Sequence, residues 1–165
     1  SYYTVNPVIV VDWHRVDQRC YEPLMQMLSD CSGAGIEYIF NCGYRTMQEQ
    51  TDILEKRTQE HMKEFDLDFD EARKKALETV AVPGTSEHQM GLAVDISGEA
   101  ANIWLAEHCW EYGFIKRYPT RKLLLTGWDE PWHYRYVGKE AAKFIMEQGI
   151  CLEEFYAHYV PDFTY

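Results

Sequence analysis

Two short segments far apart in the chain hold its most informative side chains. One reads SEHQMGLAVD (residues 86–95) and the other reads EPWH (residues 130–133). His88, Asp95 and His133 offer two imidazoles and a carboxylate, and zinc accepts both kinds of ligand in proteins. A site that uses all three requires a fold in which the two segments meet.

The spacing of His88 and Asp95 excludes one common arrangement. Two ligands on one helix are spaced i, i+4, whereas these residues are seven positions apart. Gly91 between them permits a bend, so we expect a turn that runs into a strand, with Asp95 projecting towards His88. Three protein ligands leave a fourth position for water, and Glu130 can take a proton from that water. The pattern indicates a metallohydrolase.

Each of these residues also has an ordinary role when it is considered alone. His88 fits a solvated loop histidine, His133 fits a core histidine beside Trp132, and Glu130 fits a surface acid. The joint occurrence of the two segments favours a shared site. The remaining histidines lack ligand partners at useful spacing and are expected to be structural or exposed: His14, His61, His108 and His158.

The chain is acidic and has the size of one domain. It has 165 residues, a formal net charge of −11 and a pI near 4.9. This charge disfavours nucleic acid as a partner, because nucleic-acid binding requires clustered Lys and Arg. We expect a single domain over residues 1–165, with residues 1–14 as an N-terminal arm. Nothing in the sequence indicates a protein partner.

The five cysteines form no C-x-x-C pair, so we expect reduced and mostly buried thiols, which favour a reducing compartment. No apolar run approaches the roughly 20 residues that span a membrane.

The apolar pattern predicts a mixture of helices and strands. Helices are expected from Asp17 to Gly33, Thr46 to about His61, about Asp68 to Val80, Ala100 to Glu111, Glu140 to Gln148, and from Leu152. Strands are expected over Val8–Val11 (or a packed arm), Ile36–Cys42, Leu92–Ile96, Gly113–Lys116 and His133–Val137. Because these elements show no regular βαβ alternation, the sequence predicts the α+β class.

Three motifs resemble those of the zinc D,D-peptidases of the VanY and VanX type. Residues 86–95 resemble the motif S-x-H-x-x-G-x-A-x-D, and residues 130–133 resemble E-x-W-H. Residues 43–50 (GYRTMQEQ) resemble G-Y-R-[ST]-x-x-x-Q, and residues 135–138 (RYVG) fit the VanY-like pattern. The resemblance extends over about residues 15–158.

This resemblance implies a small antiparallel-rich sheet flanked by helices, with the metal site in a cleft over the sheet, as in hedgehog-like D,D-peptidases. It implies one Zn²⁺ per chain, held by His88, Asp95 and His133. Glu130 would act as general base and then as general acid.

The resemblance also implies an anion-binding side of the cleft. Arg45 would stabilise the oxyanion, for which an always-charged guanidinium is suited. Ser86 and Gln50 would hold the C-terminal carboxylate of the substrate.

By this resemblance the substrate is a peptidoglycan precursor peptide that ends in D-Ala-D-Ala. We expect a D,D-carboxypeptidase that removes the terminal D-Ala, D-Ser or D-lactate, in cell-wall remodelling or in vancomycin-type glycopeptide resistance. The short segment from Ser97 to Ala101 leaves little chain for a cap over the site, which favours a stem peptide over a free dipeptide.

Three alternatives stay open. The first is a bifunctional D,D-dipeptidase and D,D-carboxypeptidase of the VanXY type. The second is a phage-type endopeptidase of the same fold, which fits the second motif less well. The third is a non-catalytic zinc-binding module, against which the presence of both Glu130 and Arg45 argues.

The resemblance leaves two locations for the protein. VanY-like enzymes are anchored to the membrane with the catalytic domain outside, and a chain that begins with Ser1 is compatible with an anchor that precedes it. We expect this anchored form, with the cytoplasm as the alternative that the cysteines favour.

Overall fold

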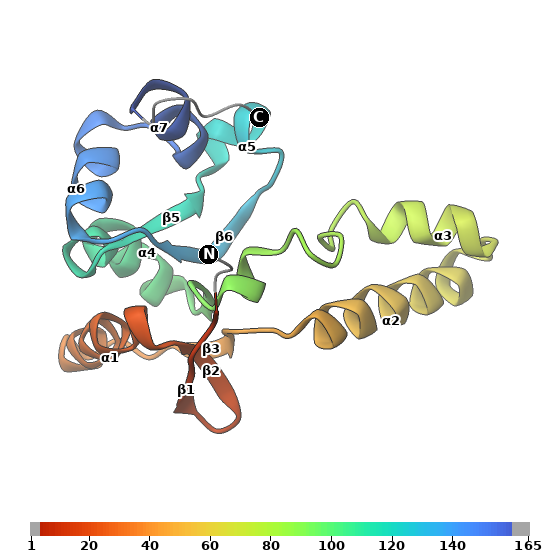
Figure 1. Cartoon of the computed structure of the whole chain (residues 1–165), viewed down its shortest axis with the longest axis horizontal. Helices are drawn as coiled ribbons and strands as arrows, with labels where there is room; N and C mark the ends of the chain where they lie inside the picture. Colours follow the sequence, from red (N-terminus) through yellow and green to blue (C-terminus); the bar gives the residue numbers. More distant parts are fainter. Residues whose placement is uncertain (1–3, 160–165) are drawn as a thin grey trace.

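The computed structural model describes residues 4–159 and contains a four-stranded sheet (Figure 1). Its strands neighbour one another in the order β3 (Ile39–Cys42), β4 (Ala93–Ser97), β6 (Glu130–Tyr136) and β5 (Phe114–Tyr118). All three neighbouring pairs are antiparallel. Strands β4 and β6 are therefore central in this sheet, and β3 and β5 lie at its edges.

Helix α1 (Gln18–Gly33) supplies much of the main core. Asp17 caps its N-terminus by accepting a hydrogen bond from the backbone N–H of Arg19. Its buried residues recur at helical spacing: Cys20, Leu24, Met27, Leu28 and Cys31. All of these except Cys31 pack in one cluster with Val94 and Ile96 of β4 and with residues of α4 (Glu99–His108) and the 3₁₀ turn η2 (Cys109–Tyr112).

A second cluster joins β5 to the C-terminal helices α6 (Lys139–Gln148) and α7 (Leu152–Tyr159). Its buried residues are Ile115, Ala142, Ile145 and Leu152. Two short elements follow β5, namely η3 (Thr120–Lys122) and α5 (Leu123–Thr126). In Figure 1, α6 and α7 lie above the strands β5 and β6, whereas α1 lies below them.

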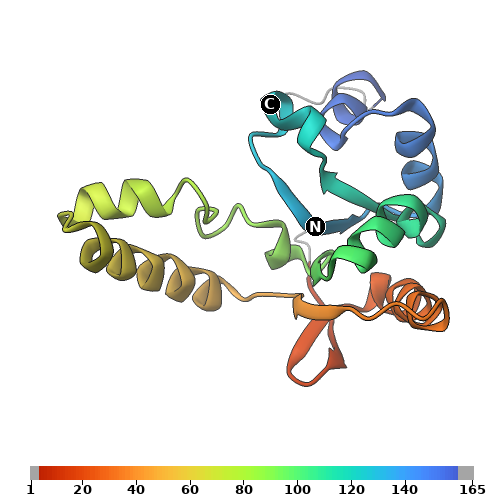
Figure 2. The ribbon, with the colours of Figure 1, turned by 180° about the vertical axis from the view of Figure 1, so that it is seen from behind.

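Helices α2 (Met47–Phe65) and α3 (Phe69–Ala76) form a hairpin that projects away from the rest of the molecule (Figures 1 and 2). Both begin with a capping box, built by Thr46 with Glu49 and by Asp68 with Glu71. The hairpin has its own small core of Leu54, Ala76 and Val80.

The N-terminal region is a β-hairpin rather than a separate arm. Strand β1 (Pro7–Val11) pairs antiparallel with β2 (His14–Asp17). The strand predicted over Val8–Val11 is thus present, whereas β2 was not predicted. Residues 1–3 of the expected arm lie outside the described residues, and a domain boundary at 1–165 stays a prediction.

The predicted α+β class with an antiparallel sheet is confirmed, while several predicted bounds are wrong. Helix α2 continues to Phe65, where Asp66 adopts the left-handed conformation that ends it. Helix α3 ends at Ala76 instead of Val80, and turns follow it, where the β-branched Thr79 and Val80 slightly disfavour a continued helix.

Other ends differ by a few residues. Strand β3 begins at Ile39, where pairing with β4 starts, and β6 begins at Glu130, which pairs with Tyr118. Helix α4 ends at His108 and gives way to a 3₁₀ turn. All five cysteines are free, and only Cys42 among them is half-buried rather than buried. No helix within residues 4–159 is both long and apolar enough to cross a membrane.

Candidate active site

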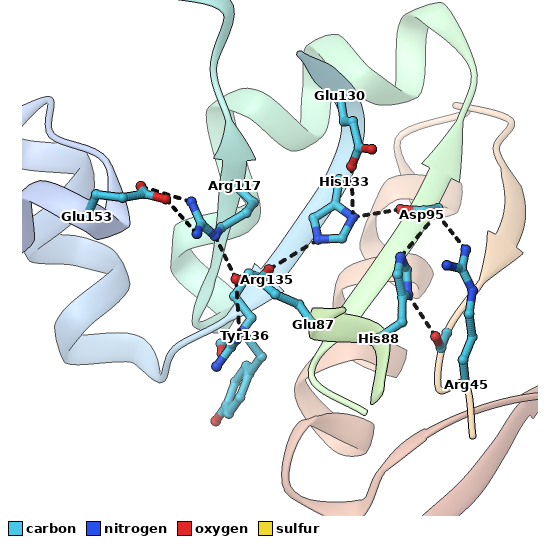
Figure 3. Close-up of polar contacts among 11 residues, drawn as sticks. Arg45, Glu87, His88, Asp95, Arg117, Glu130, His133, Arg135, Tyr136 and Glu153 are labelled. Carbon is cyan, nitrogen blue, oxygen red and sulfur yellow. Dashed lines mark hydrogen bonds and ion pairs between the residues drawn. The ribbon is translucent and has the colours of Figure 1, made fainter. Parts of the chain in front are cut away.

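Three candidate side chains form one row across neighbouring strands. Cys42 of β3 lies opposite Asp95 of β4, and Asp95 lies opposite His133 of β6. Opposite residues of an antiparallel pair project from the same face of a sheet. The strand register therefore places His133 Nδ1 3.0 Å from Asp95 Oδ1, although the two residues are 38 positions apart (Figure 3).

His88 joins this row from η1 (Glu87–Met90), the 3₁₀ turn directly before β4. Gly91 ends η1 with a φ of 69°, and a Cβ there would lie 2.9 Å from the backbone nitrogen of Asp17. Both constraints favour glycine. The turn directs His88 Nε2 to within 3.3 Å of Asp95 Oδ2, as the sequence predicted.

Each histidine is held through its second ring nitrogen. His88 Nδ1 lies 2.8 Å from the carbonyl oxygen of Gly43, and His133 Nε2 lies 3.2 Å from Glu87 Oε2. A Cβ at Gly43 would collide with the carbonyl oxygen of Arg15, so this close approach requires glycine. Histidine ligands of metals typically have one nitrogen fixed by a carbonyl or carboxylate and the other facing the metal.

The donor set suits zinc, which accepts nitrogen, oxygen and sulfur ligands. The ligand atoms of Cys42, His88 and Asp95 all lie within 4.8 Å of one another. His133 contacts the same Asp95, so the described residues offer four donors of which three were predicted. Cys42 Sγ also accepts a hydrogen bond from Arg45 Nε at 3.0 Å, so the thiol contacts Arg45 as well as His88 of the cluster.

Proton affinities in the cluster reflect its close ion pairs. Burial would lower the pKa of His88, but its hydrogen bonds with Asp95 and Cys42 raise that pKa to about 10. Burial would raise the pKa of Asp95, but the two histidines hold it below its usual range. The site thus concentrates positive charge around one buried carboxylate, and a divalent cation would replace the protons that now supply this charge.

Glu130 lies beside this cluster, at the start of β6. Its Oε2 is 3.5 Å from His133 Nδ1. Burial is the main reason that its pKa is raised above the usual value of a glutamate. A raised pKa makes the half-buried carboxylate a stronger base, as proton abstraction from a water molecule requires.

Arg45 lies on the other side of Asp95, with Nη2 3.8 Å from Asp95 Oδ2. Its Nη1 donates to Gln50 Oε1 at 3.1 Å, and Gln50 Nε2 donates to the carbonyl oxygen of Ala81 at 2.9 Å. Gln50 is almost fully buried and orients Arg45. Its predicted contact with a substrate carboxylate stays a prediction, as does that of Ser86, which is also buried.

These residues line a cavity of about 420 Å³. The predicted site residues Arg45, Gln50, Ser86, His88, Asp95, Glu130 and His133 all contribute to its wall. Trp128 and Trp132 line it near Glu130, while Ile53, Arg57 and Leu77 extend it along the α2–α3 hairpin. Trp132 is 41% exposed, so it borders the cleft without closing it.

The sequence did not predict a role for Glu87. Its carboxylate contacts His133 and also accepts a hydrogen bond from Arg117 Nε at 2.7 Å. Burial would raise its pKa, but His133, Arg117 and Arg135 lower it to about 2. The available signal was the position of Glu87 inside the first motif, directly before the ligand His88.

Comparisons with known proteins identify chains that this one is similar to. The family model described as VanY, D-alanyl-D-alanine carboxypeptidase, matches residues 13–139. A D-alanyl-D-alanine carboxypeptidase of Enterococcus faecalis is 45% identical over 150 residues, which cover 86% of this chain and 55% of that protein. A putative carboxypeptidase of Bacillus subtilis, YodJ, is 36% identical, over 82% of this chain and 51% of its own length. The chain thus spans about half the length of these curated relatives.

Two solved structures match over a larger share of both chains than these relatives do. The structure of VanYB in complex with D-alanine-D-alanine superposes with a TM-score of 0.85 and 39% identity, over 95% of this chain and 91% of that chain. A mutant of the vancomycin resistance D,D-pentapeptidase VanY from a VanB-type cassette, in complex with Zn(II), gives a TM-score of 0.84 and 41% identity. That match covers 93% of this chain and 90% of the other.

Proposed function

Because this chain belongs to the VanY family of D-alanyl-D-alanine carboxypeptidases, we propose that it is a zinc-dependent D,D-carboxypeptidase. Its substrate is a peptidoglycan precursor peptide that ends in D-Ala-D-Ala. The observation that carries the proposal is the placement of Glu130 and Arg45 on the two sides of Asp95, since a purely structural metal site requires neither a proton carrier nor a cation.

The proposed zinc ligands are His88 Nε2, Asp95 and His133 Nδ1. The two nitrogens are the ones that face Asp95 while the opposite ring nitrogens are engaged by Gly43 and Glu87. Bound zinc supplies a water of lowered pKa and polarises the scissile carbonyl. We assign Cys42 no ligand role, because its thiol is hydrogen-bonded to Arg45.

Side chains of the protein carry out proton transfer, stabilisation of the developing negative charge and substrate binding. Glu130 takes a proton from the attacking water and later donates it to the leaving amine, and its raised pKa makes it a stronger base for the first step. Arg45, fixed by Gln50, stabilises the negative charge that develops on the carbonyl oxygen of the substrate. Ser86 and Gln50 are proposed to bind the C-terminal carboxylate.

The cleft favours a peptide longer than two residues. Its wall includes the exposed Trp132 and also Ile53 and Arg57 of α2, in addition to the residues proposed to hold the zinc and the terminal carboxylate. Removal of the terminal residue would lower the amount of precursor that ends in D-Ala-D-Ala, and this supports a role in cell-wall remodelling or glycopeptide resistance.

The test is the release of D-alanine by the zinc-loaded protein from D-Ala-D-Ala and from a stem pentapeptide. We expect a much larger kcat/KM for the pentapeptide, and none for a matched peptide that ends in L-Ala. Pentapeptides ending in D-Ser or D-lactate then rank the accepted termini.

The same experiment distinguishes the alternatives. Comparable activity on both substrates indicates a bifunctional enzyme, and activity on the dipeptide alone contradicts the proposal. Cleavage at an internal bond indicates an endopeptidase. Full zinc occupancy without release from any substrate indicates a binding module.

A further inference from the structure

A buried chain of charged side chains leads from the metal centre to the C-terminal helix. It starts at His133, passes through Glu87 and Arg117, and ends at Glu153 of α7 (Figure 3). Each link is shorter than 3.3 Å, and all four side chains are less than one-fifth exposed. Charged groups are seldom buried to this extent without a specific arrangement of partners.

Glu87 is the link that contacts a proposed metal ligand. Its Oε2 is 3.2 Å from His133 Nε2, and its Oε1 accepts from Arg117 Nε at 2.7 Å. Arg135 Nη1 adds a second cation 3.3 Å from the same Oε1. The arginines contact Oε1 of Glu87, so its Oε2 is the oxygen that accepts a hydrogen bond from Nε2 of His133. Because Nε2 is engaged by Glu87, Nδ1 is the nitrogen of His133 that faces Asp95.

Arg117 is fixed more firmly than a typical surface arginine. Its two terminal nitrogens contact both oxygens of Glu153, at 3.0 and 2.7 Å, in a bidentate pair. Its guanidinium also lies 4.6 Å from the centre of the Tyr118 ring. Glu153 lies beyond residue 139, where the match to the family model ends.

We infer that Glu87 is a positioning residue for the zinc ligand His133, and that the pair of Arg117 with Glu153 extends this positioning to helix α7. This inference rests on the proposed function in taking His133 as a ligand. It goes beyond the proposed function by making the affinity for zinc depend on Glu153, which lies beyond the residues that the family model matches.

The neighbouring Glu154 provides a matched control. It lies on the same helix and forms its own ion pair with Lys122 at 2.8 Å, and it also accepts from the backbone N–H of Cys151. Its carboxylate therefore anchors α7 without touching Glu87 or Arg117. A loss that arises only from weaker docking of α7 would be similar in Glu153→Gln and Glu154→Gln.

The experiment measures the zinc affinity of the full chain by competition with a chelator, together with thermal unfolding of the metal-free protein. We expect Glu87→Gln to weaken zinc binding about 10- to 100-fold, as loss of an outer partner of a ligating histidine typically does. Glu153→Gln should weaken it about 2- to 30-fold. Glu154→Gln should leave the zinc affinity at the wild-type value.

Kinetics provide a second readout that a structural role would not change. With saturating zinc, Glu87→Gln should lower kcat for the stem pentapeptide with little change in KM, because Glu87 acts on the ligand rather than on the substrate.

Wild-type zinc affinity in Glu87→Gln overturns the inference, as do equal losses in Glu153→Gln and Glu154→Gln. If Glu87→Gln fails to fold, the zinc affinities of Glu153→Gln and Glu154→Gln are compared instead, and this comparison alone decides the question. A wild-type protein that binds zinc but cleaves no peptide would refute the proposed function, and the affinities would still test the positioning role.

Discussion

The sheet and the α2–α3 hairpin line the same cleft but are stabilised in different ways. Asp95 and His133 are fixed by the register of β4 and β6, by their contact with each other and by the contact of His133 with Glu87. The hairpin contributes Gln50, Ile53 and Arg57 from one face of α2 and projects away from the main core (Figure 2).

The energetic basis of the two regions differs accordingly. The sheet belongs to the large cluster built around α1, whereas the hairpin depends on the small cluster of Leu54, Ala76 and Val80. Regions with few buried apolar contacts open more easily than the core. We therefore expect the sheet to determine metal binding and chemistry, and the hairpin to determine how a substrate is held.

The strongest test of this division concerns the metal. His133→Ala should abolish stoichiometric zinc binding, while Cys42→Ser should retain it, because the two residues flank Asp95 in the same row but only His133 is a proposed ligand. Metal analysis of the purified variants after dialysis measures both. If His133→Ala retains zinc and Cys42→Ser loses it, then Cys42 rather than His133 is the zinc ligand.

Next in size is the effect of removing the proton carrier. Glu130→Gln should bind zinc like the wild type and lower kcat about 10²- to 10⁴-fold, since the amide cannot accept the proton of the attacking water. Zinc analysis and steady-state kinetics on the pentapeptide check this. Wild-type turnover in this variant contradicts the mechanism.

A smaller effect is expected in the hairpin. Leu54, which is 1% exposed, fills its core, and Leu54→Ala should destabilise the hairpin by about 2–5 kcal/mol. The consequence should be a raised KM and faster amide hydrogen exchange in α2 and α3, with unchanged zinc affinity. Leu124→Ala, at a fully exposed leucine, is the control. Loss of zinc from the Leu54 variant would show that the two regions are not separable.

The smallest effect depends on pH. The hydrogen bond with Lys122 lowers the pKa of Glu154 from 4.5 to about 2. A lowered pKa stabilises the folded protein above pH 4.5, and this contribution is lost as the pH falls towards 2. Glu154→Gln should therefore cost about 0.2–1 kcal/mol of unfolding free energy at pH 7 and less at pH 3. If the difference in unfolding free energy between the wild type and Glu154→Gln grows as the pH falls, Glu154 does not have the lowered pKa assigned to it.

The sequence predicted the site well where the information is local. The turn at Gly91 and the seven-residue spacing imply how His88 reaches Asp95, and the structure has that turn. The meeting of Asp95 with His133 depends instead on the register of β4 and β6, which the motif resemblance implied and periodicity alone does not define.

The role of Glu87 was beyond sequence reasoning. Arg117 is 30 positions from Glu87 and 36 from Glu153, and no local pattern links the three. Likewise, strand β2 is short and its partner residues decide its conformation. The polar helix pattern of α2 predicted a helix but not its projection from the core, which is a tertiary property.

The row of side chains across β3, β4 and β6 also has a consequence for biosynthesis. A nascent chain leaves the ribosome from its N-terminus, so Cys42, His88 and Asp95 are all available before His133 has been made. A zinc ion acquired at that stage would meet a thiolate in place of the second imidazole. Loading after β6 is complete would offer the ion the imidazole of His133 as well, so the order in which β6 and the metal arrive would decide which donors the ion meets first.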